Sequence, residues 1–139
     1  MSDSILETTR RRMQNDPFAR SLGIELVELR SGYARMQLQL GESLLNFIGI
    51  PHGGAVFALA DQAFAAACNS RGWISVALNA NISFLAAAQP NARLTATAEE
   101  NSYGRKTASY QVIVEDDEGR RIATFHGLAY RLEKTPARD

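Results

Sequence analysis

The chain has 139 residues, enough for one ordinary domain with a buried core, and its 45% hydrophobic and 22% charged residues are typical of a globular protein. Its formal net charge of +0 disfavours a general nucleic-acid binder, which would carry an excess of basic residues. Cys68 is the only cysteine, so no disulfide can form within the chain. The polar start lacks the apolar core of a signal peptide, and the longest apolar region is too short to span a bilayer. We therefore expect a cytoplasmic protein with no nucleic-acid or membrane partner.

The first third of the chain indicates a helical segment followed by a hairpin. Residues 1–22 form the predicted helical segment, which Pro17 breaks because proline disfavours a helical residue before it. After Gly23, residues 24–29 and 33–40 alternate apolar and polar side chains on either side of a short turn. This pattern predicts two antiparallel strands.

The rest of the chain indicates one helix followed by strands. A glycine-containing loop, residues 41–54, leads into an alanine-rich helix over residues 55–70. Four strand-like segments follow, at residues 73–85, 93–101, 106–115 and 120–132. The polar tail, residues 133–139, is expected to be frayed.

These elements predict a single α+β domain over residues 1–139. The helix over residues 55–70 has no polar face, and such a helix is usually buried on all sides. Helices and strands do not alternate, which disfavours a doubly wound α/β fold. An antiparallel sheet curled around the one helix is the simplest way to bury it.

Asp61 is the residue of this helix that most needs an explanation. It is the only acidic or basic side chain between His52 and Arg71, and helical spacing places Phe57 and Phe64 on its face. Burial would raise the pKa of such a carboxyl, which suits a general base or a nucleophile near neutral pH. A solvent-exposed aspartate is the ordinary alternative, but an exposed face would carry further charges.

The sequence His52-Gly53-Gly54 stands directly before the helix. Glycines at a helix start let a ligand approach the backbone and leave N–H groups unpaired. The helix dipole favours negative charge at this end, so an oxyanion that develops on a carbonyl would be stabilised there. Taken alone, the tripeptide is better explained as a tight turn that His52 caps.

Spacing limits how these two features can act together. Gly53 and Asp61 are eight positions apart, which is ~12 Å if both lie on one helix. They then cannot touch one reacting carbonyl within a single chain, so joint action needs two copies across a symmetric interface. Other chemistries fit poorly: there is no nucleophile elbow or phosphate-binding loop, and His52, His126 and Cys68 make no convincing zinc site.

At family level, the pattern Asn-x(5)-His-Gly-Gly-x(6)-Asp, from Asn46 to Asp61, resembles the PaaI-type (phenylacetate-degradation) hotdog-fold acyl-CoA thioesterases. The likeness continues through Cys68-Asn69-Ser70-Arg71-Gly72 and through the strand segments. It implies a hotdog fold, with chains paired into homodimers and commonly into homotetramers, and an active site at the dimer interface. It implies no metal and no organic cofactor.

The reaction implied by the resemblance is hydrolysis of an acyl-CoA, which we expect to be an aryl- or arylacetyl-CoA, to the free acid and CoA. Asp61 would attack the carbonyl or activate water, and the Gly53 N–H of the other subunit would polarise the carbonyl oxygen. Asn46 and His52 would orient the reacting groups. The expected substrate-binding residues are Gly54, Phe47, Phe64 and Arg105.

One stretch departs from the family pattern. Residues 86–92 are Ala-Ala-Ala-Gln-Pro-Asn-Ala where such proteins commonly have Arg-Pro and then Gly-Asp, so a phosphate contact there is not expected. Two alternatives to hydrolysis remain open at this point. A hotdog hydratase or dehydratase would also use a carboxylate and a histidine, and a non-catalytic acyl-CoA-binding domain would need an effector region.

Overall fold

The computed structural model describes residues 2–134, with side chains described from Ser4 to Leu132. Two short helices open the chain, α1 (Ser2–Gln14) and α2 (Pro17–Leu22). Asp16 caps α2 by accepting a hydrogen bond from the Ala19 N–H at 2.9 Å, and Pro17 is the first helical residue. Gly23 ends α2 in the left-handed conformation, at φ 84°. The predicted break at Pro17 and the predicted end at Gly23 are both confirmed.

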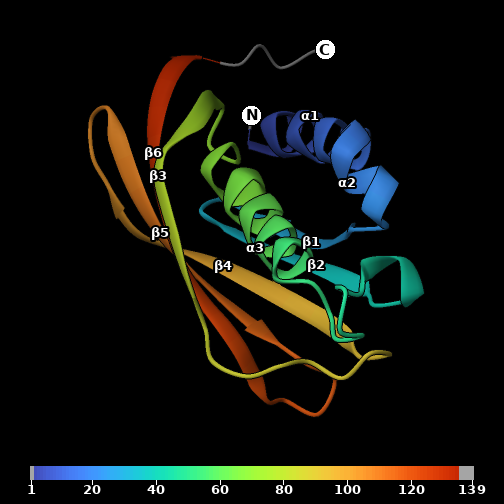
Figure 1. Ribbon diagram of the computed structural model, residues 1–139. Helices are drawn as coiled ribbons and strands as arrows, with labels where there is room; N and C mark the ends of the chain where they lie inside the picture. Colours follow the sequence, from blue (N-terminus) through green and yellow to red (C-terminus); the bar gives the residue numbers. More distant parts are fainter. Residues whose placement is uncertain (1, 135–139) are drawn as a thin grey trace.

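Within residues 2–134, six strands form one antiparallel sheet that curls around a single long helix (Figure 1). The elements after α2 are, in chain order, β1 (Glu25–Arg30), β2 (Tyr33–Gln39), the short 3-10 helix η1 (Glu42–Leu44), α3 (Gly53–Cys68), β3 (Trp73–Phe84), β4 (Arg93–Tyr103), β5 (Thr107–Glu115) and β6 (Arg121–Lys134). The strand order across the sheet is β1-β2-β4-β5-β6-β3, and every neighbouring pair is antiparallel. The α+β architecture expected from the sequence is confirmed.

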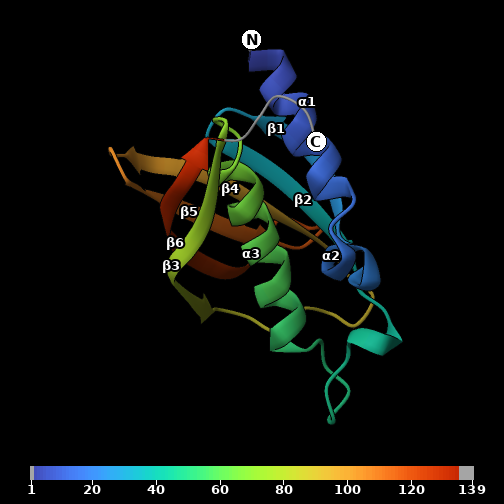
Figure 2. The ribbon, with the colours of Figure 1, turned by 90° about the horizontal axis from the view of Figure 1, so that it is seen from above.

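The core lies between the inner face of the sheet and α3. Buried residues of β2, β4 and β5 alternate with outward-facing ones, as a sheet with one covered face requires. Small side chains on α3, mostly alanine, let the helix lie close to the strands. Figure 2 shows α1 and α2 along one side of α3 and β3 along the other.

Some boundaries differ from the expected ones. Helix α3 begins at Gly53, two residues earlier than expected, because His52 caps it, and it ends at Cys68. Strand β6 runs to Lys134, so the first two residues of the tail expected to be frayed belong to a strand; residues 135–139 lie outside the described part. In residues 2–134, no helix has the length and apolarity needed to cross a membrane.

The burial of α3 also differs from the expectation. The helix is not covered on all sides: Gly54 is exposed, and Phe57, Asp61 and Ala65 are half-buried. These residues lie on one stripe, because they recur at three- and four-residue spacing. The sheet and the N-terminal helices cover the other faces of α3 but leave this stripe open in the single chain.

Candidate active site

The start of α3 carries the His-Gly-Gly sequence. His52 is extended, at φ −67° and ψ 133°, and its Nδ1 accepts a hydrogen bond from the Gly54 N–H at 2.8 Å. An accepting Nδ1 leaves the proton of the neutral ring on Nε2. The His52 carbonyl accepts hydrogen bonds from the Ala55 and Val56 N–H groups, at 3.0 and 3.3 Å. The capping role weighed for His52 in the sequence is therefore present.

Only one of the two glycine N–H groups remains free. The Gly54 N–H is bonded to His52, whereas the Gly53 N–H makes no hydrogen bond within residues 2–134. Gly53 thus presents an unpaired donor at the positive end of the α3 dipole, which is the arrangement that stabilises an oxyanion. The expectation of two outward-pointing N–H groups is wrong for Gly54, because the imidazole takes that donor.

Each glycine also has a steric reason to be there. A Cβ on Gly54 would lie 3.0 Å from His52 Nδ1, so a side chain would press on the cap. A Cβ on Gly53 would lie 3.3 Å from Cζ of Phe84, an aromatic residue 56% exposed at the end of β3. The Phe84 ring therefore lies beside the free N–H. Phe84 is not among the site residues that were predicted from the sequence.

Asn46 organises the loop that precedes α3. Its Oδ1 accepts hydrogen bonds from the N–H groups of Ile48, at 3.0 Å, and Ile50, at 3.2 Å. Its own N–H donates to the Ile50 carbonyl at 2.7 Å, and Gly49 supplies the positive φ, 82°, that the turn requires. The amide nitrogen of the Asn46 side chain has no partner within residues 2–134, so it remains available as a donor.

Asn46 and Gly53 face a common cavity of about 410 Å³. The cavity lies between the loop before α3, the first turn of α3 and the chain that leaves β3. Its lining residues are Asn46, Ile50, Pro51, Gly53, Val56, Phe84, Leu85, Ala86, Ala87, Ala88 and Ile122. The structure thus brings together two of the expected catalytic residues in one hollow beside the free N–H.

Asp61 lies on the open stripe of α3. Desolvation by its surroundings is the main cause that raises the pKa of Asp61 above its usual value, and the negative charge of Asp16 raises it further. The carboxylate accepts no hydrogen bond from any residue in the described part of the chain. A half-buried carboxylate with a raised pKa and unused lone pairs has the properties of a general base or a nucleophile.

Gly53 and Asp61 both lie on α3, so their eight-residue spacing is a distance along one helix, as expected from the sequence. Eight residues of helix separate them by ~12 Å along the axis. Within one chain, a carbonyl held at the Gly53 N–H is therefore out of reach of the Asp61 carboxylate.

The two aromatic residues expected to bind substrate, Phe47 and Phe64, differ in their exposure to solvent. Phe47 is 96% exposed at the tip of the loop before α3. Phe64 is 2% exposed, and its ring packs against Tyr110 and Phe125 with centroids 5.7 Å away in both cases. The expectation that Phe64 contacts substrate is not supported, because close packing on Gly127 fixes this ring in the core.

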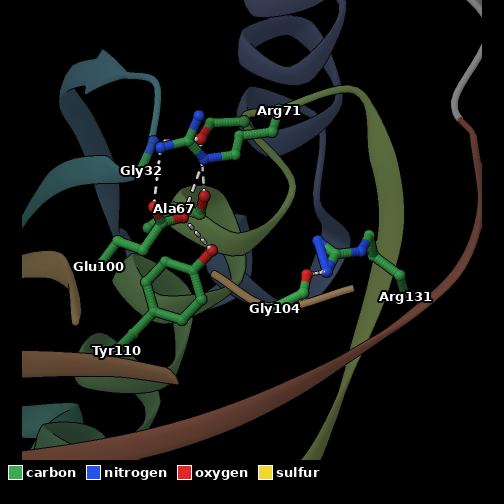
Figure 3. A network of polar contacts seen from close by, with 8 residues as sticks. Gly32, Ala67, Arg71, Glu100, Gly104, Tyr110 and Arg131 are labelled. Atoms are coloured by element: carbon green, nitrogen blue, oxygen red, sulfur yellow. Dashed lines mark hydrogen bonds and ion pairs between the residues drawn. The ribbon is translucent and has the colours of Figure 1, made fainter. Parts of the chain in front are cut away.

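Arg105 is exposed in the turn between β4 and β5, far from the start of α3 along the sheet. Beside this turn, the Arg131 guanidinium donates to the Gly104 carbonyl and lies over the Tyr103 ring, 4.1 Å from its centroid. Figure 3 shows the Arg131 side chain on Gly104, the residue that precedes Arg105 in the chain. The arginine expected to meet the nucleotide end of a substrate therefore lies one residue from a contact of Arg131.

A polar network anchors the C-terminal end of α3 to the sheet (Figure 3). Arg71 donates to both oxygens of Glu100, at 2.9 and 2.7 Å, and the Tyr110 hydroxyl donates to Glu100 at 2.8 Å. Burial alone would raise the pKa of Glu100, but hydrogen bonds from Arg71 and Tyr110 outweigh it and hold that pKa below its usual value. The network holds the segment that directly follows α3 against β4 and β5.

Cys68 is not a second candidate nucleophile. Its side chain is buried at the end of α3, and burial is the main cause that raises the pKa of its thiol to about 12. A thiol in this state is almost wholly protonated at neutral pH and is a small core residue.

Comparisons with known proteins show the family of the chain. The family model described as the thioesterase superfamily matches residues 48–123, which span the end of the loop before α3, α3 itself, β3, β4, β5 and the start of β6. The acyl-coenzyme A thioesterase PaaI of Escherichia coli K12 is 33% identical over 135 residues, which cover 97% of this chain and 96% of that protein.

Solved structures show the same likeness. The structure of the E. coli PaaI protein from the phenylacetic acid degradation operon matches with a TM-score of 0.91 and covers 96% of this chain and 97% of its own, at 33% identity. A hypothetical thioesterase protein from Streptococcus pneumoniae, solved with coenzyme A, matches with a TM-score of 0.78 at 27% identity over 81% of this chain and 88% of its own. The chain therefore belongs to the thioesterase superfamily and is a PaaI-type thioester hydrolase of the hotdog fold.

Proposed function

We propose that this enzyme hydrolyses aryl- or arylacetyl-CoA thioesters to the free acid and CoA. The observation that carries the proposal is the arrangement of α3, which has an unpaired Gly53 N–H at its positive end and a half-buried carboxylate, Asp61, two turns further on. One group can hold a developing oxyanion, and the other can supply or generate a nucleophile.

The proposed site is shared by two chains, because one chain separates its own Gly53 and Asp61 by ~12 Å. β3 supports this pairing, since it is a 12-residue strand at the free edge of the sheet. Its residues Val76 and Leu78 are exposed, and the unpaired backbone groups of a long edge strand are a surface on which another strand can pair. We propose a homodimer formed at this edge, with Asp61 of one chain near Gly53 of the other, and a homotetramer of two such dimers.

In the proposed reaction the thioester carbonyl oxygen accepts a hydrogen bond from the Gly53 N–H. The Asp61 carboxylate either removes a proton from water, which attacks the carbonyl carbon, or attacks that carbon itself to form an anhydride that water then cleaves. In both cases the carbon–sulfur bond breaks, the sulfur leaves as the CoA thiolate and takes up a proton, and the acyl group becomes the free acid. Asn46 and His52 orient the thioester, through the free amide of one and the Nε2–H of the other.

The proposed substrate class rests on the likeness to PaaI and on the aromatic surroundings of the free N–H. Phe84 lies beside Gly53, and the exposed Phe47 is placed to meet a partner chain or the substrate. Arg105, with Arg131 nearby, is proposed to contact the phosphates at the nucleotide end of CoA. We also propose a cytoplasmic location, since the buried Cys68 has no disulfide partner and CoA esters are intracellular metabolites.

The test is thiol release from a panel of phenylacetyl-, hydroxyphenylacetyl-, benzoyl-, acetyl- and long-chain acyl-CoAs. We expect free thiol and free acid in equal amounts, with the aryl esters cleaved most efficiently. Addition of water to an unsaturated acyl-CoA without thiol release would identify a hydratase, and binding without any turnover would identify a non-catalytic domain. Either result would contradict the proposal.

A further inference from the structure

One wall of the cavity that contains Asn46 and Gly53 is the chain that leaves β3, residues 85–88. The last two residues of this wall, Ala87 and Ala88, make no hydrogen bond between backbone groups within residues 2–134. Their side chains carry no polar group, and only the Ala88 methyl group is buried. A segment with so few contacts of its own opens easily unless another residue holds it.

Arg120, in the turn between β5 and β6, provides such a contact. Its Nη2 donates a hydrogen bond to the Ala87 carbonyl at 2.5 Å, across 33 positions of the chain. The Ala87 carbonyl accepts no other hydrogen bond in the described part of the chain, and a charged donor makes this one strong. The first half of the wall is tied to the same hairpin, because the Leu85 and Ala86 N–H groups both donate to the Ile122 carbonyl.

The turn holds Arg120 in a defined position. Oδ1 of Asp116 accepts hydrogen bonds from the Glu118 N–H at 3.0 Å and from the Arg120 N–H at 2.8 Å, and Gly119 supplies the positive φ, 79°. The bond from the Arg120 N–H is the largest cause that holds the pKa of Asp116 below its usual value, so this carboxylate is charged at neutral pH. Its Oδ2 lies 3.6 Å from Nε of Arg120, so one end of the guanidinium faces Asp116 while the other reaches Ala87.

We propose that Arg120 is a positioning residue, which holds residues 85–88 in place as a wall of the cavity that receives the substrate. The inference rests on the proposed thioesterase function and deepens it, because it gives the β5–β6 turn a role in substrate binding. Arg120 is not itself a lining residue of the cavity, so it acts through the wall. A wall that contacts the bound substrate and the transition state alike lowers KM without raising kcat. Loss of Arg120 should therefore raise KM and leave kcat nearly unchanged.

The test compares wild type, Arg120→Ala and Arg120→Lys in thiol release from phenylacetyl-CoA. Arg121→Ala is the matched control, because Arg121 is also exposed but makes no hydrogen bond or ion pair with any residue in the described part of the chain. We expect Arg120→Ala to raise KM by roughly three- to tenfold, with kcat within about twofold of wild type. Arg120→Lys keeps a charged donor and should recover part of the loss, and Arg121→Ala should match wild type.

The pantetheine thioester of the same acid separates positioning from direct contact with CoA, because pantetheine lacks the nucleotide and its phosphates. If Arg120 acts through the wall, Arg120→Ala lowers kcat/KM by the same factor for the pantetheine ester as for the CoA ester. A loss confined to the CoA ester would show that Arg120 binds a phosphate itself, and it would overturn the positioning role.

A role in folding alone has a different signature. Arg120→Ala would then melt at a lower temperature and lose kcat with the folded fraction, while KM stayed unchanged. That result, or kinetics equal to those of wild type, would overturn the inference and leave the thioesterase function standing. If wild type releases no thiol from any acyl-CoA, the proposed function fails, and the role of Arg120 in that reaction fails with it.

Discussion

Replacing Gly53 with proline isolates the N–H that the mechanism assigns to the oxyanion. Gly53 is the first residue of α3, a position where proline is favoured, and the preceding His52 has the extended ψ of 133° that a following proline needs. Gly53 has no positive φ, and its N–H makes no hydrogen bond within residues 2–134, so the fold loses no bond. Gly53→Pro therefore deletes one donor and leaves the helix start in place.

We expect Gly53→Pro to lower kcat by the amount that the loss of one oxyanion donor causes. Removal of such a donor lowers kcat by roughly 10²–10³, or ~3 kcal/mol of transition-state stabilisation. Gly53→Ala is the control, because it adds the same Cβ, 3.3 Å from Cζ of the exposed Phe84 ring, but keeps the N–H. We expect Gly53→Ala to lose far less activity than Gly53→Pro, with similar melting temperatures for the two.

The assay is steady-state thiol release from phenylacetyl-CoA, with circular dichroism and thermal melting as checks on the fold. The ratio of kcat between the alanine and proline variants measures the contribution of the N–H. A ratio near one in two folded variants would refute the oxyanion role of Gly53. Equal, severe losses in both would show that the Cβ, and not the missing N–H, blocks the site.

Three further predictions follow from the structure. Asp16→Asn removes the negative charge that raises the pKa of Asp61, so the acid limb of the kcat/KM profile should move to lower pH; an unchanged limb would contradict the coupling. Gly127→Ala places a Cβ 2.5 Å from the buried Phe64 ring and should lower the free energy of unfolding by about 1–3 kcal/mol in urea titration, and an unaltered midpoint would show that the ring can move. Leu78→Lys puts a charge on the exposed edge of β3 and should shift sedimentation toward the monomer with loss of activity, whereas an active monomer would rule out the shared site.

The sequence is sufficient to predict features that depend on local chemistry. Pro17 and Gly23 mark the limits of α2 because each imposes a backbone conformation that does not depend on tertiary contacts. Asp61 stands out because the helix around it has no other charge, and the half-buried position of its carboxyl agrees with that interpretation.

Features that depend on which side chains meet could not be predicted in the same way. Phe18, Phe64 and Phe84 are the same residue type in the sequence. In the structure Phe18 and Phe84 are exposed beside the α3 N-terminus, whereas Phe64 is packed on Gly127. Packing across the sheet decides this difference, and local periodicity contains no information about it. Likewise, the sequence places His52 next to two glycines, but only the geometry shows that its imidazole takes the Gly54 N–H and leaves that of Gly53 free.

The most direct test of the central claim is thiol release from phenylacetyl-CoA by wild type and by Asp61→Asn, measured together with their melting temperatures. Burial raises the pKa of Asp61 in the folded chain, so its ionisation costs stability as the pH rises through that raised pKa, and the asparagine variant should melt no lower than wild type at pH 7. We predict rapid release by wild type and almost none by a fully folded Asp61→Asn. Substantial turnover by the folded variant would contradict the assignment of Asp61 as the catalytic carboxylate.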